Sequence, residues 1–333
     1  MNIKEIAKLA KTSASSVSRV INSSGYVKEE VRQRINKVLE ETGYRPNAFA
    51  KALHSKKSHT IGVILPKINA TSSGECVAGI DNFFSTKGYS ILLGNTHHQL
   101  NKELEFLDIF KEKQVDGVIF IATVLTPEHH KKLQKLAIPT VIVGQESPNN
   151  IPCVLFDEYH AAKEMTQYLL TTGKQRIAFI GVDESDISVG VHRRQGYLDA
   201  LREQHIPMDE HLLAQGDFTH QSGFTACRAI FENSTLKPDA IFAANDKMAI
   251  GAMNYLFSMG LQVPRDISVC GVGGGTLAQF YHPQLTTLIY DYKQAGIIAS
   301  DLLYRQINKD QSESITVHKT WVNYQLMIGK STQ

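Results

Sequence analysis

The sequence has 333 residues, more than one compact core holds, and this length predicts two or three structural units. Hydrophobic residues make up 42% and charged residues 20% of the chain, a composition typical of a globular protein in water. The N-terminus lacks the apolar region of a secretory signal, and no apolar run has membrane-spanning length. We therefore expect a cytoplasmic protein without membrane contact.

The net charge of +2 is distributed unevenly along the chain. Residues 1–57 hold 12 Lys and Arg residues against 5 Glu residues, a net charge of +7, which leaves −5 for the other 276 residues. A basic head on a mildly acidic body indicates that a polyanion binds at one end, although a merely solubilising surface is the alternative.

Cysteines and histidines give no sign of a metal or a reactive thiol. The four cysteines form no C-x-x-C pair and are expected to be reduced and mostly buried: Cys76, Cys153, Cys227 and Cys270. The neighbouring pairs 97–98 and 129–130 are both His-His, but adjacent residues do not share a helix face, so no metal site is predicted. No Ser-His-Asp set or carboxylate pair stands out, and we predict no catalytic residue and no cofactor.

Three helical patterns open the chain. Asn2 and Glu5 have the spacing of a capping box at the start of the first helix. A second helix is expected over 14–22 and a third over 28–42, with Gly43 as its stop. Their apolar faces suffice for one small common core.

The second helix has the features of a DNA reader. A polar helix after a short turn is typical of helix-turn-helix units, which place this helix in the major groove. Val17, Val20 and Ile21 face inward, which leaves on the outer side residues that can contact base edges: Ala14, Ser15, Ser18, Arg19 and Asn22. A Ser-rich surface helix without DNA contacts is the alternative.

From residue 60 onward, short β-branched runs alternate with helical patterns. The clearest strands are expected at 61–65, 90–93, 117–121, 140–143, 177–180, 240–243 and 267–270. This alternation predicts an α/β body of two doubly wound parallel sheets with helices on both faces. A late strand at 285–289 and a helix at 291–307 indicate that the chain crosses back to the first sheet.

Three motifs resemble the signature of the LacI/GalR repressor family. They are SVSRVIN at 16–22, YRPN at 44–47 and the pair Ala50-x-x-Leu53, and similar blocks continue to Thr287. The blocks VDGV at 115–118, IVGQ at 142–145 and SVG at 188–190 with two arginines at 193–194 are most similar to repressors of sucrose or trehalose operons.

The resemblance implies a sugar-responsive transcriptional repressor that binds a near-palindromic operator as a homodimer. The body would be similar to periplasmic binding proteins, and the segment before it would form a hinge helix only on DNA. The resulting boundaries are a helix-turn-helix domain at 1–45, a hinge helix or linker at 46–57, an N-terminal lobe at 58–156 and 289–319, and a C-terminal lobe at 157–288 and 320–333.

The resemblance also assigns further DNA contacts. Leu53 would wedge into the minor groove from the hinge, which is a marginal basic helix on its own. Asn2, Tyr44 and Asn47 would contact the DNA backbone, which positions a protein without reading sequence. Ser16 and Ala50 belong to the matched motifs and complete the predicted DNA-binding set.

Ligands of doubly wound sheets bind at the carboxyl ends of strands, so the loops after strands supply the effector candidates. Lys67, Ser72 and Ser73 follow the first strand, and Lys67 suits an anionic group. Gln145 and Asn245 follow two later strands, and the resemblance implies that Asn245 contacts the ligand. Asp246 is expected to cap the next helix and to have a structural role.

Two candidates come from the resemblance alone. Arg193 matches a sugar-binding arginine, and its planar fork suits paired hydroxyls or a phosphate; a surface charge is the alternative. Phe218 matches an aromatic position that stacks on a sugar, and a core aromatic is an equal alternative.

The stretch GVGGGT at 271–276 raises the question of a nucleotide-binding loop. The dinucleotide pattern needs a third glycine where Thr276 stands, so the loop is expected to be a pocket wall that includes Gly273. Many relatives carry an acidic pair where this chain has Gly273 and Gly274, which favours a bulkier or anionic effector such as a disaccharide or its phosphate. A solute-binding protein and, last, a nucleotide-dependent enzyme are the alternative functions.

Overall fold

The computed structural model describes residues 1–21, 24–44, 57–147, 150–308 and 319–332. The chain divides into two compact units, the head Met1–His59 and the body Thr60–Gln333. Within the described ranges, no helix is both long and apolar enough to cross a membrane.

The head is a three-helix unit, as predicted. It contains α1 (Ile3–Leu9), α2 (Ala14–Ile21) and α3 (Glu29–Thr42). Asn2 Oδ1 accepts from Lys4 N at 2.9 Å and from Glu5 N at 3.1 Å, and Asn2 N donates to Glu5 Oε2 at 3.0 Å, so the predicted capping box is confirmed. Gly43 ends α3 in the left-handed conformation that glycine adopts without strain.

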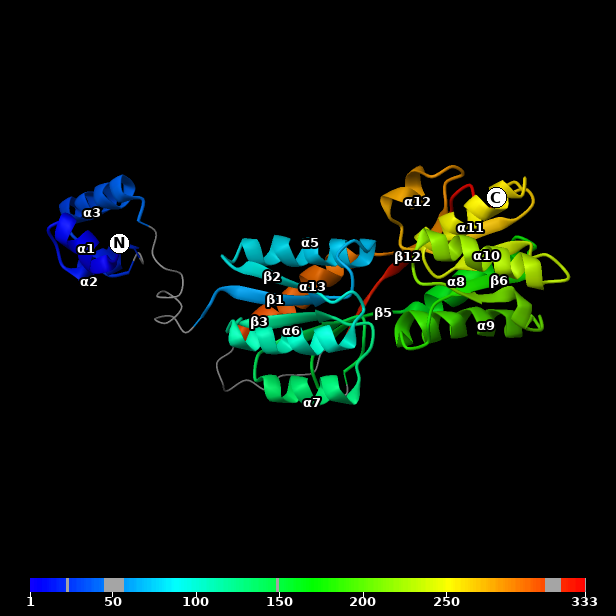
Figure 1. The fold of residues 1–333 in the computed structure, drawn as a ribbon, viewed down its shortest axis with the longest axis horizontal. Coiled ribbons are helices and arrows are strands. Elements are labelled where there is room, and N and C mark those ends of the chain that lie inside the picture. The colour runs from blue at the N-terminus through cyan, green and yellow to red at the C-terminus, as the bar shows by residue number, and fades with distance from the viewer. Residues whose placement is uncertain (22–23, 45–56, 148–149, 309–318, 333) are drawn as a thin grey trace. The chain divides into compact units, whose positions relative to one another are not determined.

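Two six-stranded sheets form the body (Figure 1). Sheet A contains β1 (Thr60–Leu65), β2 (Ser90–Asn95), β3 (Gly117–Ile121), β4 (Thr140–Val143), β5 (Cys153–Phe156) and β11 (Lys319–Val322), in the order β2-β1-β3-β4-β5-β11. Sheet B contains β6 (Ile177–Gly181), β7 (Leu213–Gln215), β8 (Ala240–Ala243), β9 (Ser268–Val272), β10 (Thr286–Tyr290) and β12 (Tyr324–Met327), in the order β7-β6-β8-β9-β10-β12. The pairs are parallel except β10 with β12.

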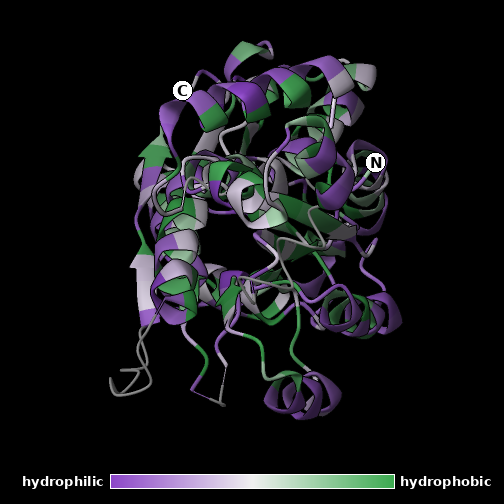
Figure 2. Cartoon of the chain, turned by 90° about the vertical axis from the view of Figure 1, so that its left-hand side faces the viewer, coloured by the Kyte–Doolittle hydropathy of each residue, from purple (hydrophilic) through white to green (hydrophobic). Residues whose placement is uncertain are grey.

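Helices cover both faces of each sheet and enclose four apolar cores. On sheet A, α5 (Thr71–Ser85) and α13 (Tyr292–Ile307) share one face, and α6 (Leu100–Glu112) and α7 (Pro127–Leu136) share the other. On sheet B, α8 (Glu158–Thr171) and α9 (Arg194–Glu203) lie opposite α10 (His220–Asn233) and α11 (Asp246–Ser258). Shorter elements are η1 (Ile187–Arg193), η2 (Glu210–Leu212) and α12 (Thr276–Phe280). In Figure 2 hydrophobic residues are green and hydrophilic residues are purple, and purple is frequent on the outer turns of the helices.

The predicted doubly wound fold is confirmed, with two corrections to the crossings between the lobes. β10 extends to Tyr290, and β11 pairs with β5 up to Val322 opposite Phe156. The chain therefore leaves sheet B after Tyr290 and returns to it after Val322, slightly later than the expected boundaries at 288 and 319. The reason is that β10 remains paired with β12 up to Tyr290, and β11 remains paired with β5 up to Val322.

Glycines let α5 and α13 approach closely across sheet A. A Cβ atom on Gly79 would lie far inside contact distance of the Lys293 carbonyl oxygen, and one on Gly296 would meet the Cys76 carbonyl oxygen in the same way. Because each glycine faces the backbone of the other helix, α13 packs tightly on sheet A although the chain before it belongs to sheet B.

We expect Gly79→Ala to lower the free energy of unfolding by about 2–3 kcal/mol, because the added methyl forces α5 and α13 apart. Urea unfolding followed by circular dichroism measures this. Gly74→Ala is the matched control in the same helix, since its Cβ would have only the Ile68 carbonyl oxygen near it, at 4.0 Å. Equal stability of the two variants would contradict the proposed close contact.

Candidate functional site

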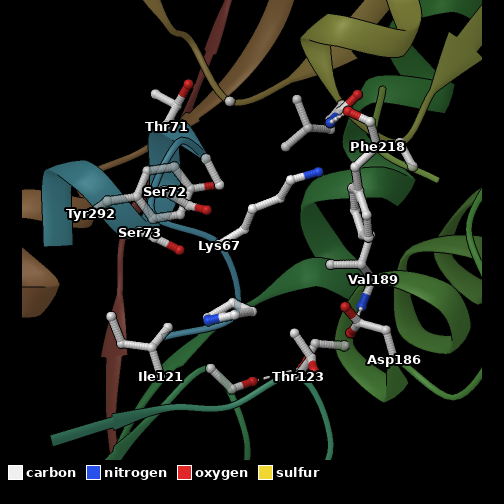
Figure 3. Close-up of a pocket in the computed structure, with 18 of the residues that line it drawn as sticks. Lys67, Thr71, Ser72, Ser73, Ile121, Thr123, Asp186, Val189, Phe218 and Tyr292 are labelled. Carbon is white, nitrogen blue, oxygen red and sulfur yellow. Dashed lines mark hydrogen bonds between the residues drawn. The ribbon is translucent and has the colours of Figure 1, made fainter. Parts of the chain in front are cut away.

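The body contains a pocket of about 320 Å³ at the carboxyl ends of strands from both sheets (Figure 3). Loops after β1, β3 and β4 line it from sheet A, and loops after β6, β8 and β9 line it from sheet B. The strand order reverses beside β1 and β6, so both switch points open toward the pocket. The structure brings all eight predicted effector residues into its wall: Lys67, Ser72, Ser73, Gln145, Arg193, Phe218, Asn245 and Gly273.

Arg193 is fixed in this wall by a buried ion pair. It ends η1, a π-helix that leads into α9, and it is only 4% exposed, so the surface-charge alternative is wrong. Its Nε donates to Glu158 Oε2 at 3.0 Å, one terminal nitrogen donates to the same oxygen, and the other donates to the Ala244 carbonyl. A guanidinium has five N–H groups, and three are used here, so two remain for a ligand.

Glu158 is a pocket residue that sequence reasoning missed. It is the first residue of α8, and the preceding Asp157 caps this helix by accepting from His160 N at 3.1 Å. A carboxylate is stabilised at a helix N-terminus by the helix dipole. The sequence contains one indication of this position, because Glu158 follows the apolar run 153–156, which forms β5. A run of four residues is too short to identify a strand by its pattern alone.

The expected cap of α11 is corrected, whereas Asn245 lines the pocket and Asp246 has structural hydrogen bonds, as expected. Asn245, not Asp246, caps α11, because its Oδ1 accepts from Met248 N at 2.8 Å while its amide donates to the Phe218 carbonyl at 3.1 Å. Asp246 lines the pocket and accepts from Thr287 Oγ1 at 2.5 Å. The cap belongs to Asn245 because its backbone is extended, as an N-cap requires.

Two carboxyl groups of the pocket ionise less readily than usual. Burial raises the pKa of Asp186 to about 6, against an opposing hydrogen bond from Val189 N at 3.0 Å. Burial likewise raises the pKa of Asp246 to about 6, and the bond from Thr287 opposes it. Arg193 lies close enough to favour the charged forms of both Asp186 and Asp246. Together with its ion pair to Glu158, this guanidinium therefore interacts with three carboxyl groups.

The glycine loop after β9 packs against Asp246 and directs its amides inward. Gly273 N donates to the Leu288 carbonyl at 2.7 Å, and Gly275 N donates to Asp246 Oδ2 at 3.2 Å. A Cβ atom on Gly271 would lie 2.8 Å from Asp246 Oδ1, and one on Gly274, whose backbone is left-handed, would collide with Ile289. These amides are used within the protein, which supports the prediction that the loop is a pocket wall rather than a phosphate cradle.

Sheet A contributes the only pocket ammonium that has no partner in the described chain. Figure 3 shows Lys67 reaching into the pocket, and its ammonium forms no ion pair or hydrogen bond with a described residue, although its charge lowers the pKa values of Asp217 and His98. Gln145 is less available, because its Nε2 donates to the Thr123 carbonyl at 2.7 Å. Ser72 and Ser73 lie nearby on α5.

Side chains from the two lobes meet around the pocket. The rings of His98, after β2, and Phe218, after β7, are stacked with their centroids 6.1 Å apart and 5° between their planes. Ser188 Oγ donates to the Gly144 carbonyl at 2.7 Å, which joins the lobes a second time. Phe218 also packs against the sheet B core, so the core-aromatic alternative is partly right. Burial lowers the pKa of His98, and Lys67 lowers it further.

One histidine of the second pair, His129, is part of the packing between α6 and α7. His129 is fully buried between α6 and α7, and its Nδ1 accepts from Thr126 N at 3.2 Å. Its other ring nitrogen must then carry the proton, and it faces Glu103 Oε2 at 3.1 Å. In the described ranges no three His, Cys, Asp or Glu side chains are grouped as metal ligands would be.

The outer face of α2 is polar and accessible, as predicted for a DNA reader. Ser15 and Arg19 are exposed, and Ala14, Ser16 and Ser18 are half-buried. Ser13, which sequence reasoning did not single out, binds the helix start, because Ser16 N donates to its Oγ at 3.1 Å and its hydroxyl lies 2.8 Å from that of Ser15.

Of the remaining predicted DNA contacts, the structure describes Asn2 and Tyr44. The side chain of Asn2 already serves the α1 cap, and Tyr44 packs partly on the head core. Four further predicted contacts lie outside the described residues, as does nearly all of the predicted hinge: Asn22, Asn47, Ala50 and Leu53.

Comparisons with known proteins agree along the whole chain. The family model described as bacterial regulatory proteins, lacI family, matches residues 2–47. The model described as periplasmic binding proteins and sugar binding domain of the LacI family matches residues 58–326.

Two relatives and one solved structure are similar to this chain over nearly their full length. Catabolite control protein A of Priestia megaterium is 36% identical, covering 95% of this chain and 96% of the relative. A sucrose operon repressor of Staphylococcus xylosus is 31% identical, covering 92% and 93%. The structure of the transcriptional regulator CelR in complex with cellobiose matches with a TM-score of 0.75 and 26% identity, covering 99% of both chains.

We expect Asp186→Asn to raise the free energy of unfolding by up to about 3 kcal/mol at about pH 7.5 and by little at about pH 4. The folded-state pKa is raised above the unfolded value, so the folded protein binds more protons between about pH 4 and pH 6, and stability falls as the pH rises through that window. The variant keeps Oδ1 for the bond from Val189 N.

Chemical denaturation at several pH values measures the difference. Asp183→Asn is the control in the same loop, because Asp183 is exposed and hydrogen bonds from Ser185 lower its pKa. Stabilisation of both variants alike, or a gain at Asp186 that does not change with pH, would refute the buried-charge explanation.

Proposed function

Because the chain belongs to the LacI family of bacterial regulatory proteins, we propose that it acts as a sugar-responsive repressor, with a near-palindromic operator bound by a homodimer. A carbohydrate effector, a disaccharide or disaccharide phosphate of the sucrose or trehalose type, releases it from DNA. The family consists of regulators, so the chain is not an enzyme. The predicted family is thereby confirmed.

The pocket chemistry carries the effector proposal. Arg193 offers two N–H groups, and carboxylates of Glu158, Asp186 and Asp246 lie around it. Sugar hydroxyls donate and accept at once, so they suit donors and acceptors placed side by side. The ring of Phe218 supplies an apolar surface for a pyranose face. Relatives named for sucrose and cellobiose support a disaccharide.

The distribution of charge suggests how a phosphorylated sugar is oriented. The sheet B side of the pocket carries three carboxylates against the guanidinium of Arg193 and the ammonium of Lys247, which donates to the Asn69 carbonyl. The sheet A side presents the ammonium of Lys67, which has no hydrogen bond or ion pair among the described residues. A phosphate is repelled by the first side and attracted by the second. We therefore place the phosphate at Lys67 and the free sugar ring against Arg193 and Asp186.

An effector that contacts both lobes acts on DNA binding through the angle between them. Its binding favours one lobe arrangement over the other, and the affinity for operator falls if that arrangement separates the paired hinge segments. The solute-binding alternative does not account for the head at 2–47, and the nucleotide-dependent enzyme loses its support because the glycine-loop amides bind within the protein.

We expect the full chain, and not residues 58–333, to retard near-palindromic DNA in a gel shift, because the head supplies the basic surface and α2. The body is a compact unit of its own, so the truncated protein serves as its own folding control when a sugar raises its melting temperature. Operator binding by residues 58–333 would contradict the role of the head.

We expect Lys67→Met to weaken binding of trehalose 6-phosphate or sucrose 6-phosphate at least about 10-fold and to change binding of the unphosphorylated sugar less than about 3-fold, since only the phosphate needs the ammonium. Isothermal titration calorimetry measures both affinities. Lys113→Met, outside the pocket, is the control. An equal loss for both sugars assigns Lys67 to the sugar ring instead.

A further inference from the structure

Aromatic rings gather where the chain crosses between the lobes. The crossings are at Asp157 between β5 and α8, at Asp291 between β10 and α13, and at Asn323 between β11 and β12. Four rings flank these residues: Phe156, Tyr290, Tyr292 and Tyr324.

Tyr290 lies in contact with each of the other rings. Its centroid is 5.3 Å from that of Phe156, 5.8 Å from that of Tyr292 and 5.9 Å from that of Tyr324. Packed rings have little free space into which to move. A shift of Tyr290 therefore displaces the rings beside all three crossings.

The hydroxyl of Tyr290 joins this cluster to the effector pocket. It donates to Glu158 Oε2 at 2.9 Å and lies 3.2 Å from the Asp157 carbonyl oxygen. Glu158 Oε2 is the oxygen that accepts from Arg193, whereas no described residue donates to Glu158 Oε1. Tyr290 does not line the effector pocket itself; its ring contacts the lining residues Phe156 and Tyr292, and its hydroxyl reaches the site through Glu158.

We propose that Tyr290 and Glu158 couple the effector to the angle between the lobes, with Glu158 as the positioning residue for Arg193 and Tyr290 as the link to the crossings. This inference rests on the proposed function. An effector hydroxyl that donates to Glu158 Oε1 and accepts from Arg193 changes the position of the carboxylate. Glu158 follows the first crossing directly, and the Tyr290 hydroxyl passes the change to the second.

Removal of the Tyr290 hydroxyl separates coupling from binding. The carboxylate keeps both bonds from Arg193, so the groups that face the effector stay in place. The ring cluster keeps its packing, because phenylalanine has the same shape. The losses are the hydroxyl's bond to Glu158 and its longer bond to the Asp157 carbonyl.

The experiment compares Tyr290→Phe with wild type in two measurements on the full chain. Calorimetry with sucrose, trehalose and their 6-phosphates gives the effector affinity, and operator affinity with and without the tightest of these sugars gives a coupling factor. Allosteric coupling factors are typically on the order of 5- to 150-fold. We expect effector affinity within about 3-fold of wild type and a coupling factor reduced towards 1.

Tyr324→Phe is the matched control. Its ring belongs to the same cluster, but its hydroxyl donates to Glu164 Oε2 at 2.8 Å on the exposed side of α8, away from the pocket. It should keep the wild-type coupling factor. Equal loss of coupling in both variants would show that ring packing, not the bond to Glu158, is responsible, and would overturn the proposal.

Glu158→Gln provides a second test, because it leaves Arg193 buried without its counter-charge. We expect weaker effector binding together with lost coupling, in contrast to the pure coupling defect of Tyr290→Phe. If wild type binds operator but none of the sugars alters this, the proposed function fails and the inference with it. If wild type responds and Tyr290→Phe responds equally, the inference alone is wrong.

Discussion

The buried ion pair of Arg193 with Glu158 is the interaction on which the body depends for its site. A guanidinium held at 4% exposure needs a counter-charge and nearly complete hydrogen bonding, and Glu158 with the Ala244 carbonyl supplies most of both. The pair fixes the geometry of η1 against α8 and leaves two donors aimed at the pocket. One interaction therefore holds η1 against α8 and orients the ligand groups of the sheet B lobe.

Strand order explains why residues distant in the sequence meet there. Both sheets have the same order, with the first strand of each placed next to the third, so their loops open toward one space. Pocket residues from Lys67 to Gly273 are brought together by this topology rather than by local sequence. The two sheets are connected by the three crossings, each only a few residues long. The relative position of the sheets can therefore change through rotations at those few residues.

The main features were predictable from sequence because they depend on local patterns. Fully buried strands such as 117–121 and 240–243 are continuous apolar runs, and their boundaries agreed with the structure. The short strands β5, β7, β11 and β12 were missed, since three or four residues at or near a sheet edge carry little periodicity. Glu158 and Asp186 were missed for a related reason, because ordinary acidic residues acquire a role only through burial.

The tight packing of the glycine loop limits which parts of the pocket wall can change when sugar preference changes. Side chains at Gly271 and Gly274 would strike Asp246 and Ile289, so in this chain a substitution at either glycine requires these neighbours to move. The loop that carries Lys67 also lines the pocket, and a Cβ atom on Gly74 nearby would have only the Ile68 carbonyl oxygen near it, at 4.0 Å. Changes of sugar preference among descendants of this chain should therefore need fewer compensating changes on the sheet A side than at Gly271 or Gly274.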